Sequence, residues 1–187
     1  MIDKLALQIT SLICTEAYNN TKDRARIQYG LTVLLSEGFK IVFLLLFFNV
    51  IHKQNYFYFS LLIILSTRLF AGGLHLKGTL NCLIATTLLF TLTSVLAPLA
   101  PKLPVACYLL IGLISLVTVL IRAPIRSVVR PIKDNTKKLQ HKFTAALLIA
   151  IWTIILLFLG NTTYVNCGFS TILVQSVLLV LVKKPKL

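Results

Sequence analysis

Long runs of apolar residues dominate this sequence and restrict what it can fold into. Six runs of 17 to 24 residues lie at 27–50, 56–74, 79–99, 105–121, 143–159 and 164–182. About 20 apolar residues in a helix cross the ~30 Å hydrocarbon core of a bilayer. Because backbone polar groups in lipid must be satisfied internally, the runs predict helices. We therefore expect an all-α, polytopic membrane protein with about six transmembrane helices, of which the second and third, interrupted by charge and glycine, could be partly re-entrant.

The N-terminal segment differs from these runs. Its first thirty residues carry several charges and no continuous apolar core, so they do not predict a cleavable signal peptide. Ile2, Leu5 and Ile9 recur at helical spacing within residues 2–18, which predicts an amphipathic helix on the membrane surface or one packed against the ends of the spans. We expect a single integral membrane domain over 1–187, divided into the surface helix and linker (1–26), the bundle (27–182) with a basic loop (122–142), and a basic tail (183–187).

Positive charge predicts the orientation of the chain. Nineteen Lys and Arg face five acids, a net charge of +14. The aromatic residues lie in apolar runs rather than among basic residues, which argues against nucleic acid as a partner. Seven of the positive charges fall between Arg122 and Lys142, against Asp134 alone. By the positive-inside rule, we expect both termini, this loop and the turn between the second and third runs on the cytosolic side of the membrane, with anionic lipids as partners.

Several chemistries are excluded by the residues present. The four cysteines are scattered without metal-ligand or disulfide spacing, so we expect no metal and no cofactor. No apolar run contains an Asp, and no H-E-x-x-H or G-x-S-G motif occurs, which excludes two-aspartate, zinc and serine membrane proteases. A phosphate-binding G-x-x-x-x-G-K-[ST] loop is also missing.

The reactive side chains are concentrated in one stretch, R-L-F-A-G-G-L-H-L-K-G-T-L-N-C, from Arg68 to Cys82. Cys82 is a candidate nucleophile and His75 a candidate base, the combination used by thiol hydrolases and transferases. The other candidates supply backbone freedom or positive charge: Gly72, Gly73, Arg68 and Lys77. Arg68 could equally extend its charge to the cytosolic surface.

The spacing of the pair predicts a break in the helix. Seven residues place His75 and Cys82 on nearly the same helix face but roughly 10.5 Å apart along the axis, too far for a hydrogen bond. We therefore expect the helix to break at or near Gly78, with His75 ending or following one span and Cys82 in the first turn of the next. The positive end of a helix dipole favours a thiolate, and backbone N–H groups around Leu80 to Leu83 could stabilise an oxyanion.

A third catalytic member is not selected by the sequence. Asn81, Ser66 or Glu37 could orient the imidazole. Glu37 and Lys40 are three residues apart inside the first run and should pair, either structurally or as support for substrate or His75.

The arrangement of Arg68, Gly72-Gly73, His75 and Cys82 resembles the motif of the accessory gene regulator protein B family, bacterial membrane endopeptidases that process quorum-sensing peptide precursors. The chain length, the pattern of spans and Ala123-Pro124 before a basic loop resemble that family along nearly the whole chain. The resemblance implies Cys82 as nucleophile and His75 as its base.

The resemblance also implies a reaction and partners. Cleavage through an acyl-enzyme thioester would release the C-terminal tail of a precursor of the accessory gene regulator protein D type, and ring closure would give a thiolactone or lactone without ATP. Tails of such precursors tend to be acidic, so the basic loop could bind them in addition to setting topology. The residues concerned are Arg126, Arg130, Lys133, Lys137 and Lys138. The family further implies a homodimer.

A different class of function remains open from the residues alone. A small multi-span transporter or channel, possibly one that exports a peptide, could line a polar path with Glu37, Lys40, Arg68 and His75. A structural membrane subunit without chemistry is a third interpretation. Neither of these requires the thiol of Cys82.

Overall fold

The structure is a computed structural model of the chain, and it describes residues 7–11, 21–73, 78–125 and 134–182. The fold divides into two compact units, Met1–His52 and Lys53–Leu187. Each unit is described by itself. Most of the expected N-terminal surface helix and the basic tail lie outside the described residues, although residues 7–11 are helical.

The first unit contains one long helix, α2 (Thr21–Val50). Its portion from Ile27 to Val50 is long and apolar enough to cross a membrane, as predicted for the first run. The Lys40 ammonium donates to the Glu37 carboxylate at 2.5 Å, so the predicted ion pair is formed one turn apart on the same face.

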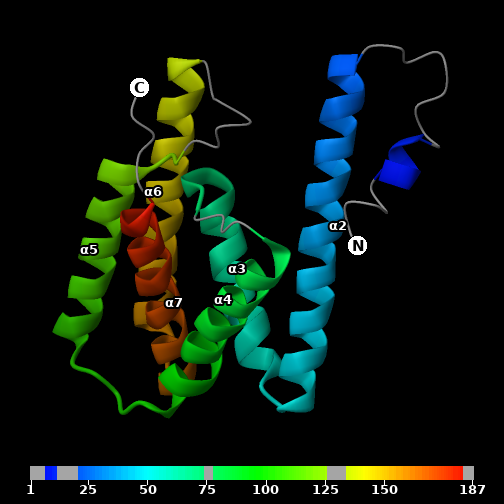
Figure 1. The fold of residues 1–187 in the computed structure, drawn as a ribbon. Helices are drawn as coiled ribbons and strands as arrows, with labels where there is room; N and C mark the ends of the chain where they lie inside the picture. The colour runs from blue at the N-terminus through cyan, green and yellow to red at the C-terminus, as the bar shows by residue number, and fades with distance from the viewer. Residues whose placement is uncertain (1–6, 12–20, 74–77, 126–133, 183–187) are drawn as a thin grey trace. The chain divides into compact units, whose positions relative to one another are not determined.

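The second unit is a bundle of helices (Figure 1). Their bounds are α3 (Gln54–Ala71), α4 (Thr79–Thr91), α5 (Val105–Arg122), α6 (Asn135–Phe158) and α7 (Thr162–Leu181). α4 continues through a π-helical turn, η1 (Leu92–Leu96), and a 3₁₀ turn, η2 (Ala97–Leu99). The protein is therefore all-α in the part of the chain that the structure describes.

Five described helices are long and apolar enough to span a membrane, including α4 together with its extensions. α3, with 18 residues and Arg68 in its last turn, is not among these five but packs against α6 and α7. The expected number of about six spans is thus approximate. α6 begins at Asn135, well before the predicted start at 143, because the Asp134 carboxylate accepts the Thr136 N–H at 2.9 Å and caps a polar first turn.

α7 is the central helix of this unit. It contacts α3, α5 and α6, and Figure 1 shows it among them. Phe169, Ile172 and Leu179 of α7 are buried in the core, where the Phe169 ring stacks on Tyr108 of α5 with centroids 4.8 Å apart. In lipid, tight packing of this kind rather than water exclusion holds helices together.

A buried cluster of hydroxyls joins three elements in the core. The Ser60 Oγ of α3 accepts hydrogen bonds from Ser94 Oγ of η1 and from Thr171 Oγ1 of α7, each at 3.1 Å. The Cys167 thiol of α7 lies 3.1 Å from the same oxygen. Since these groups bond to one another, the cluster serves helix association.

The connection between η2 and α5 is also anchored on α7. The Tyr108 hydroxyl donates to the Asn166 side-chain oxygen and accepts the Leu103 N–H at 3.1 Å. Asn166 in turn donates to the Ala100 carbonyl at 2.7 Å. The end of the bundle opposite Gly72 is therefore closed by hydrogen bonds to the loop backbone.

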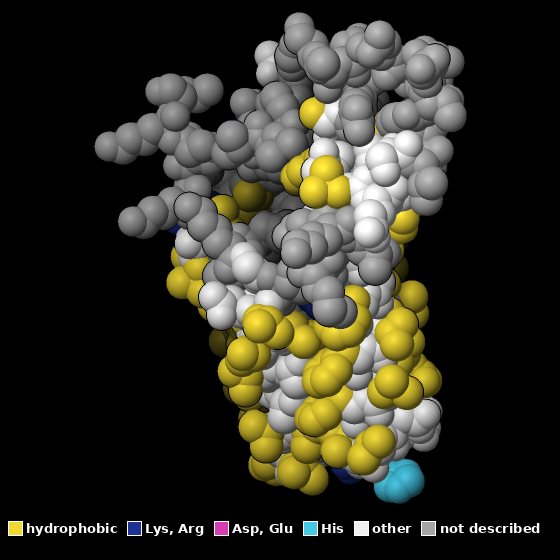
Figure 2. Space-filling view, turned by 45° about the vertical axis from the view of Figure 1, so that its right-hand side comes forward, with side chains coloured by type: hydrophobic (Ala, Val, Ile, Leu, Met, Phe, Trp, Pro, Cys, Tyr) yellow, Lys and Arg dark blue, Asp and Glu magenta, His cyan; other side chains and the backbone are white. Residues whose placement is uncertain are grey.

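Apolar side chains cover most of the described helical surface in the view of Figure 2. Examples of large apolar side chains that are at least half exposed are Leu109, Leu113 and Leu147. Such a surface would be insoluble in water and is suited to lipid. The protein is a membrane protein.

The packing predicts which glycine is sensitive to substitution. A Cβ added at Gly168 would lie 2.3 Å from Cδ2 of the fully buried Leu156, whereas one added at Gly160 meets nothing within 4 Å. We expect Gly168→Ala to lower the free energy of unfolding by about 1–3 kcal/mol through overpacking. The measurement is the fraction of monodisperse protein left after heating in detergent. Gly160→Ala is the control, and equal heat sensitivity of the two variants would contradict this packing.

Candidate active site

The first part of the candidate site is the end of α3. The helix ends at Ala71, and Gly72 follows with φ 79° and ψ −169°, a conformation open essentially to glycine alone. The Gly72 N–H donates to the Arg68 carbonyl at 2.9 Å. An added Cβ would lie 2.8 Å from the Ile125 carbonyl oxygen. Both the backbone conformation and the available space therefore require glycine here.

Two further hydrogen bonds tie this turn to distant parts of the chain. The Ile125 N–H, just beyond α5, donates to the Ala71 carbonyl at 3.0 Å. The Gln175 side-chain amide of α7 donates through Nε2 to the Gly72 carbonyl at 3.2 Å. The backbone at the end of α3 is therefore held by the neighbouring helices as well as by its own.

Arg68 and Gly73 are brought into direct contact. A Cβ built on Gly73 would lie 2.5 Å from the Arg68 Nε and 3.0 Å from Cζ. The half-buried arginine thus folds along the glycine turn that follows its own helix. Glycine at this position leaves room for the guanidinium.

The second part of the site is the start of α4. Gly78, with φ 90°, is the cap residue, and α4 begins at Thr79. The Cys82 N–H donates to the Gly78 carbonyl at 3.2 Å, which closes the first turn. The predicted break near Gly78, with Cys82 in the first turn of the next helix, is therefore confirmed.

Cys82 lies on the inward face of its helix. Its exposed fraction is 9%, whereas Leu80 and Ile84 beside it are exposed. Phe90, two turns further along the buried face, packs edge-on against the Phe57 ring of α3 with centroids 4.9 Å apart. A buried cysteine on the protein-facing side is protected from lipid.

The remaining predicted residues fall into three groups. His75 and Lys77 lie outside the described residues, as do Arg126, Arg130 and Lys133. Asn81 is exposed in the first turn of α4, and Lys137 and Lys138 lie in the first turn of α6. Glu37 belongs to the first unit, where it pairs with Lys40.

Two groups that were candidates for supporting the reaction, the Ser66 hydroxyl and the backbone N–H of Cys82, have hydrogen-bond partners in the structure. The Ser66 hydroxyl accepts the Trp152 indole N–H at 2.9 Å and donates to the Ile63 carbonyl at 2.9 Å, so it serves packing of α3 on α6. The Cys82 N–H is used by Gly78. By helix geometry, Leu80 and Asn81 keep N–H groups without an acceptor within α4.

The sequence model of the family Accessory gene regulator B matches residues 6–179. The chain belongs to this family. A relative from Clostridium beijerinckii, a putative AgrB-like protein, is 31% identical over 161 residues, which cover 86% of this chain and 79% of the relative. No solved structure matches the chain. Family membership links the protein to peptide processing in the accessory gene regulator quorum-sensing system.

Two residues at the site of this family member were not singled out from its sequence. Gln175 lies in an apolar run, and a polar side chain within a span is a signal of an internal role that could have been followed. Ile125 acts through its backbone N–H, which no sequence pattern distinguishes. Both contact the glycine turn that the motif contains.

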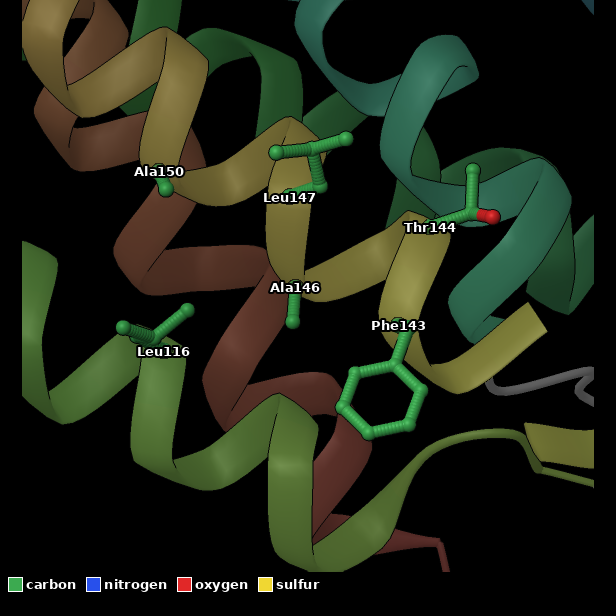
Figure 3. A pocket seen from close by; sticks show the side chains of 6 residues that line it. All are labelled: Leu116, Phe143, Thr144, Ala146, Leu147 and Ala150. Atoms are coloured by element: carbon green, nitrogen blue, oxygen red, sulfur yellow. The ribbon is translucent and has the colours of Figure 1, made fainter. Parts of the chain in front are cut away.

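A pocket of about 470 Å³ elsewhere in the bundle is not part of this site (Figure 3). Leu116 of α5 and Phe143 and Ala146 of α6 border the same space, and Thr144 is the one polar side chain among its described lining residues. None of the described residues of the motif, 68–73 and 78–82, lines it. Its apolar walls offer no group for peptide chemistry.

Proposed function

We propose that this protein is a membrane cysteine endopeptidase that cleaves the C-terminal tail from a quorum-sensing precursor and promotes cyclisation of the remaining peptide. The observation that carries the proposal is the placement of Cys82: it is buried, on the inward face, and in the first turn of a helix that begins directly after the motif's break at Gly78. Membership of the accessory gene regulator B family supports the substrate class.

The first half of the reaction forms an acyl-enzyme. His75 accepts the thiol proton of Cys82, and the sulfur attacks the carbonyl carbon of the scissile peptide bond. When the tetrahedral intermediate collapses, the C–N bond breaks and the imidazolium returns its proton to the departing amine. The products are a thioester on Cys82 and a free C-terminal tail.

The second half closes the ring. A Cys or Ser of the bound precursor gives its proton to His75 and attacks the thioester carbonyl. The bond to the Cys82 sulfur then breaks, the imidazolium returns the proton to that sulfur, and a thiolactone or lactone forms. When the product is a thiolactone, one thioester replaces another of similar bond energy, so the step needs no ATP. Burial of Cys82 favours this transfer over hydrolysis, because less water reaches the thioester.

The start of α4 can supply the oxyanion donors. The N–H groups of Leu80 and Asn81 have no intrahelical acceptor and lie at the positive end of the helix dipole. We propose that these two N–H groups donate hydrogen bonds to the oxygen that becomes negative in the tetrahedral intermediate. Arg68 and Lys77 add positive charge near the acidic tail, and Asn81 orients the imidazole.

The basic segment between α5 and α6 is the proposed docking site for the acidic tail. Lys137 and Lys138 at the start of α6 are its described members, and Arg126, Arg130 and Lys133 complete it in the sequence. This segment, both termini and the active site face the cytosol in the proposed topology, and the protein acts as a homodimer.

Charge removal at this segment tests the docking site. We expect Lys137→Gln together with Lys138→Gln to raise KM for a precursor with an acidic tail by about 3–10-fold, with kcat little changed, since these are solvent-screened contacts. Steady-state cleavage at low and high salt is the measurement. The control is Lys102→Gln, an exposed lysine in the connection before α5. Equal KM values in both variants would exclude a docking role.

The acyl-enzyme itself is the decisive test of the function. The purified protein is incubated with its precursor, quenched in acid, digested and examined by mass spectrometry. We expect a precursor fragment on the peptide that contains Cys82, and we expect hydroxylamine to release it. His75→Ala should prevent its accumulation. A precursor that is cleaved without any adduct on Cys82 would contradict the mechanism.

A further inference from the structure

Every backbone polar atom of Gly72 is engaged. Its N–H donates to the Arg68 carbonyl at 2.9 Å, and its carbonyl accepts Nε2 of Gln175 at 3.2 Å. The contact with Gln175 joins residues 103 positions apart. Together with the bond from the Ile125 N–H to the Ala71 carbonyl, it determines how the chain leaves α3.

The burial of Gln175 makes this contact informative. The side chain is only 1% exposed, and its Oε1 has no hydrogen-bond partner among the residues the structure describes. The orientation of the amide follows from its partner: a carbonyl only accepts, so Nε2 must face Gly72 and Oε1 must face away. A buried acceptor left unmet is unfavourable, and an apolar side chain of the same size would avoid that cost. Packing alone therefore does not explain a glutamine here.

The other buried polar residues nearby on α7 behave differently. The Ser176 hydroxyl donates to the Ile172 carbonyl of its own helix at 2.9 Å. The Thr171 hydroxyl lies 2.7 Å from the Cys167 carbonyl of its own helix and 3.1 Å from the Ser60 hydroxyl of α3. The Ser176 bond is local. The Thr171 contact joins two side chains within the helical core and does not reach the backbone where a helix ends. Gln175 is distinguished from them because its donor reaches the backbone of another helix end.

We propose that Gln175 is a positioning residue of the endopeptidase: by holding the Gly72 carbonyl, it directs the chain that leaves α3 toward His75, three residues further on, so that His75 acts on Cys82. This inference rests on the proposed function. Gln175 touches neither the thiol nor the scissile bond in this role. Its effect is transmitted through the glycine turn.

The experiment compares variants of the full-length protein in detergent. The readouts are the rate of Cys82 alkylation by iodoacetamide, followed on the Cys82 peptide by mass spectrometry, and the kcat and KM for precursor cleavage. Gln175→Met keeps the volume but removes the donor. We expect it to slow alkylation and kcat by about 10-fold or more with KM changed less than about 2-fold. Ser176→Ala, its buried neighbour, should behave as wild type.

A conservative variant separates positioning from packing. In Gln175→Glu, a buried carboxyl held neutral can donate its O–H to the Gly72 carbonyl. We expect this variant to recover both rates to within about 3-fold of wild type, a difference small on the free-energy scale. If Gln175→Met does not yield folded protein, Gln175→Asn, which stays polar but is shorter, takes its place with the same expected loss.

A double mutant links the effect to His75. If Gln175 acts through His75, Gln175→Met should slow alkylation in wild type but add little in a His75→Ala background. Additive losses, or a Met variant indistinguishable from Ser176→Ala, would overturn the proposal for Gln175. If His75→Ala itself leaves alkylation and cleavage unchanged, it is the proposed function that is wrong.

Discussion

Replacing Cys82 by alanine should lower the rate of precursor cleavage by about 10⁴-fold or more. The reason is that the proposed mechanism has no other nucleophile to form the acyl-enzyme. The protein should remain folded. The thiol lies on a helix face whose packing is provided further along by Phe90 against Phe57, and alanine keeps the helix intact. Release of the tail from purified precursor, followed by mass spectrometry, is the measurement.

The matched control is Cys107→Ala in α5. Cys107 is also a free cysteine in a span, but it lies outside the motif. We expect it to cleave at the wild-type rate. If Cys82→Ala still cleaves, the endopeptidase mechanism fails. A transporter would tolerate Cys82→Ala, so retained peptide export with no cleavage by the wild type would favour that alternative.

Replacing Gly72 by alanine should have the second largest effect. The φ and ψ of Gly72 lie in a region that side chains avoid, which costs about 1–3 kcal/mol for a non-glycine residue. In addition, the new Cβ would lie 2.8 Å from the Ile125 carbonyl oxygen, which is backbone and cannot move away easily. Relief requires a shift of the whole turn, with loss of the Gln175 contact.

The expected result for Gly72→Ala is a lower melting temperature together with a drop in kcat of at least about 10²-fold, because a displacement of about 1 Å at a catalytic element is enough for such a loss. Thermal stability in detergent and precursor cleavage are measured on the same sample. Gly38→Ala in α2, where an added Cβ meets nothing within 4 Å, is the control. A Gly72→Ala variant as active and stable as Gly38→Ala would show that the turn is not constrained as described.

Much of the local structure followed from sequence patterns. Each described helix of the second unit matches an apolar run to within a few residues, except α6, where the Asp134 cap adds a polar start that hydropathy does not detect. Five of the six runs correspond to helices that are long and apolar enough to cross a membrane, and α3 is the exception among the described helices. The break at Gly78 followed from the spacing between His75 and Cys82. These features depend on neighbours within a few turns, so a linear sequence contains the information.

The tertiary structure decided how the end of α3 is held. Gln175 and Ile125 meet the glycine turn only because α7 and the chain after α5 pack beside α3. The Ser66 hydroxyl, one of three candidates in the sequence for orienting the imidazole, accepts the indole N–H of Trp152 from α6. Hydrogen bonds between residues 54 to 103 positions apart depend on which helix faces meet. The apolar runs alone do not specify that pairing, because in lipid nearly every face of a span is hydrophobic.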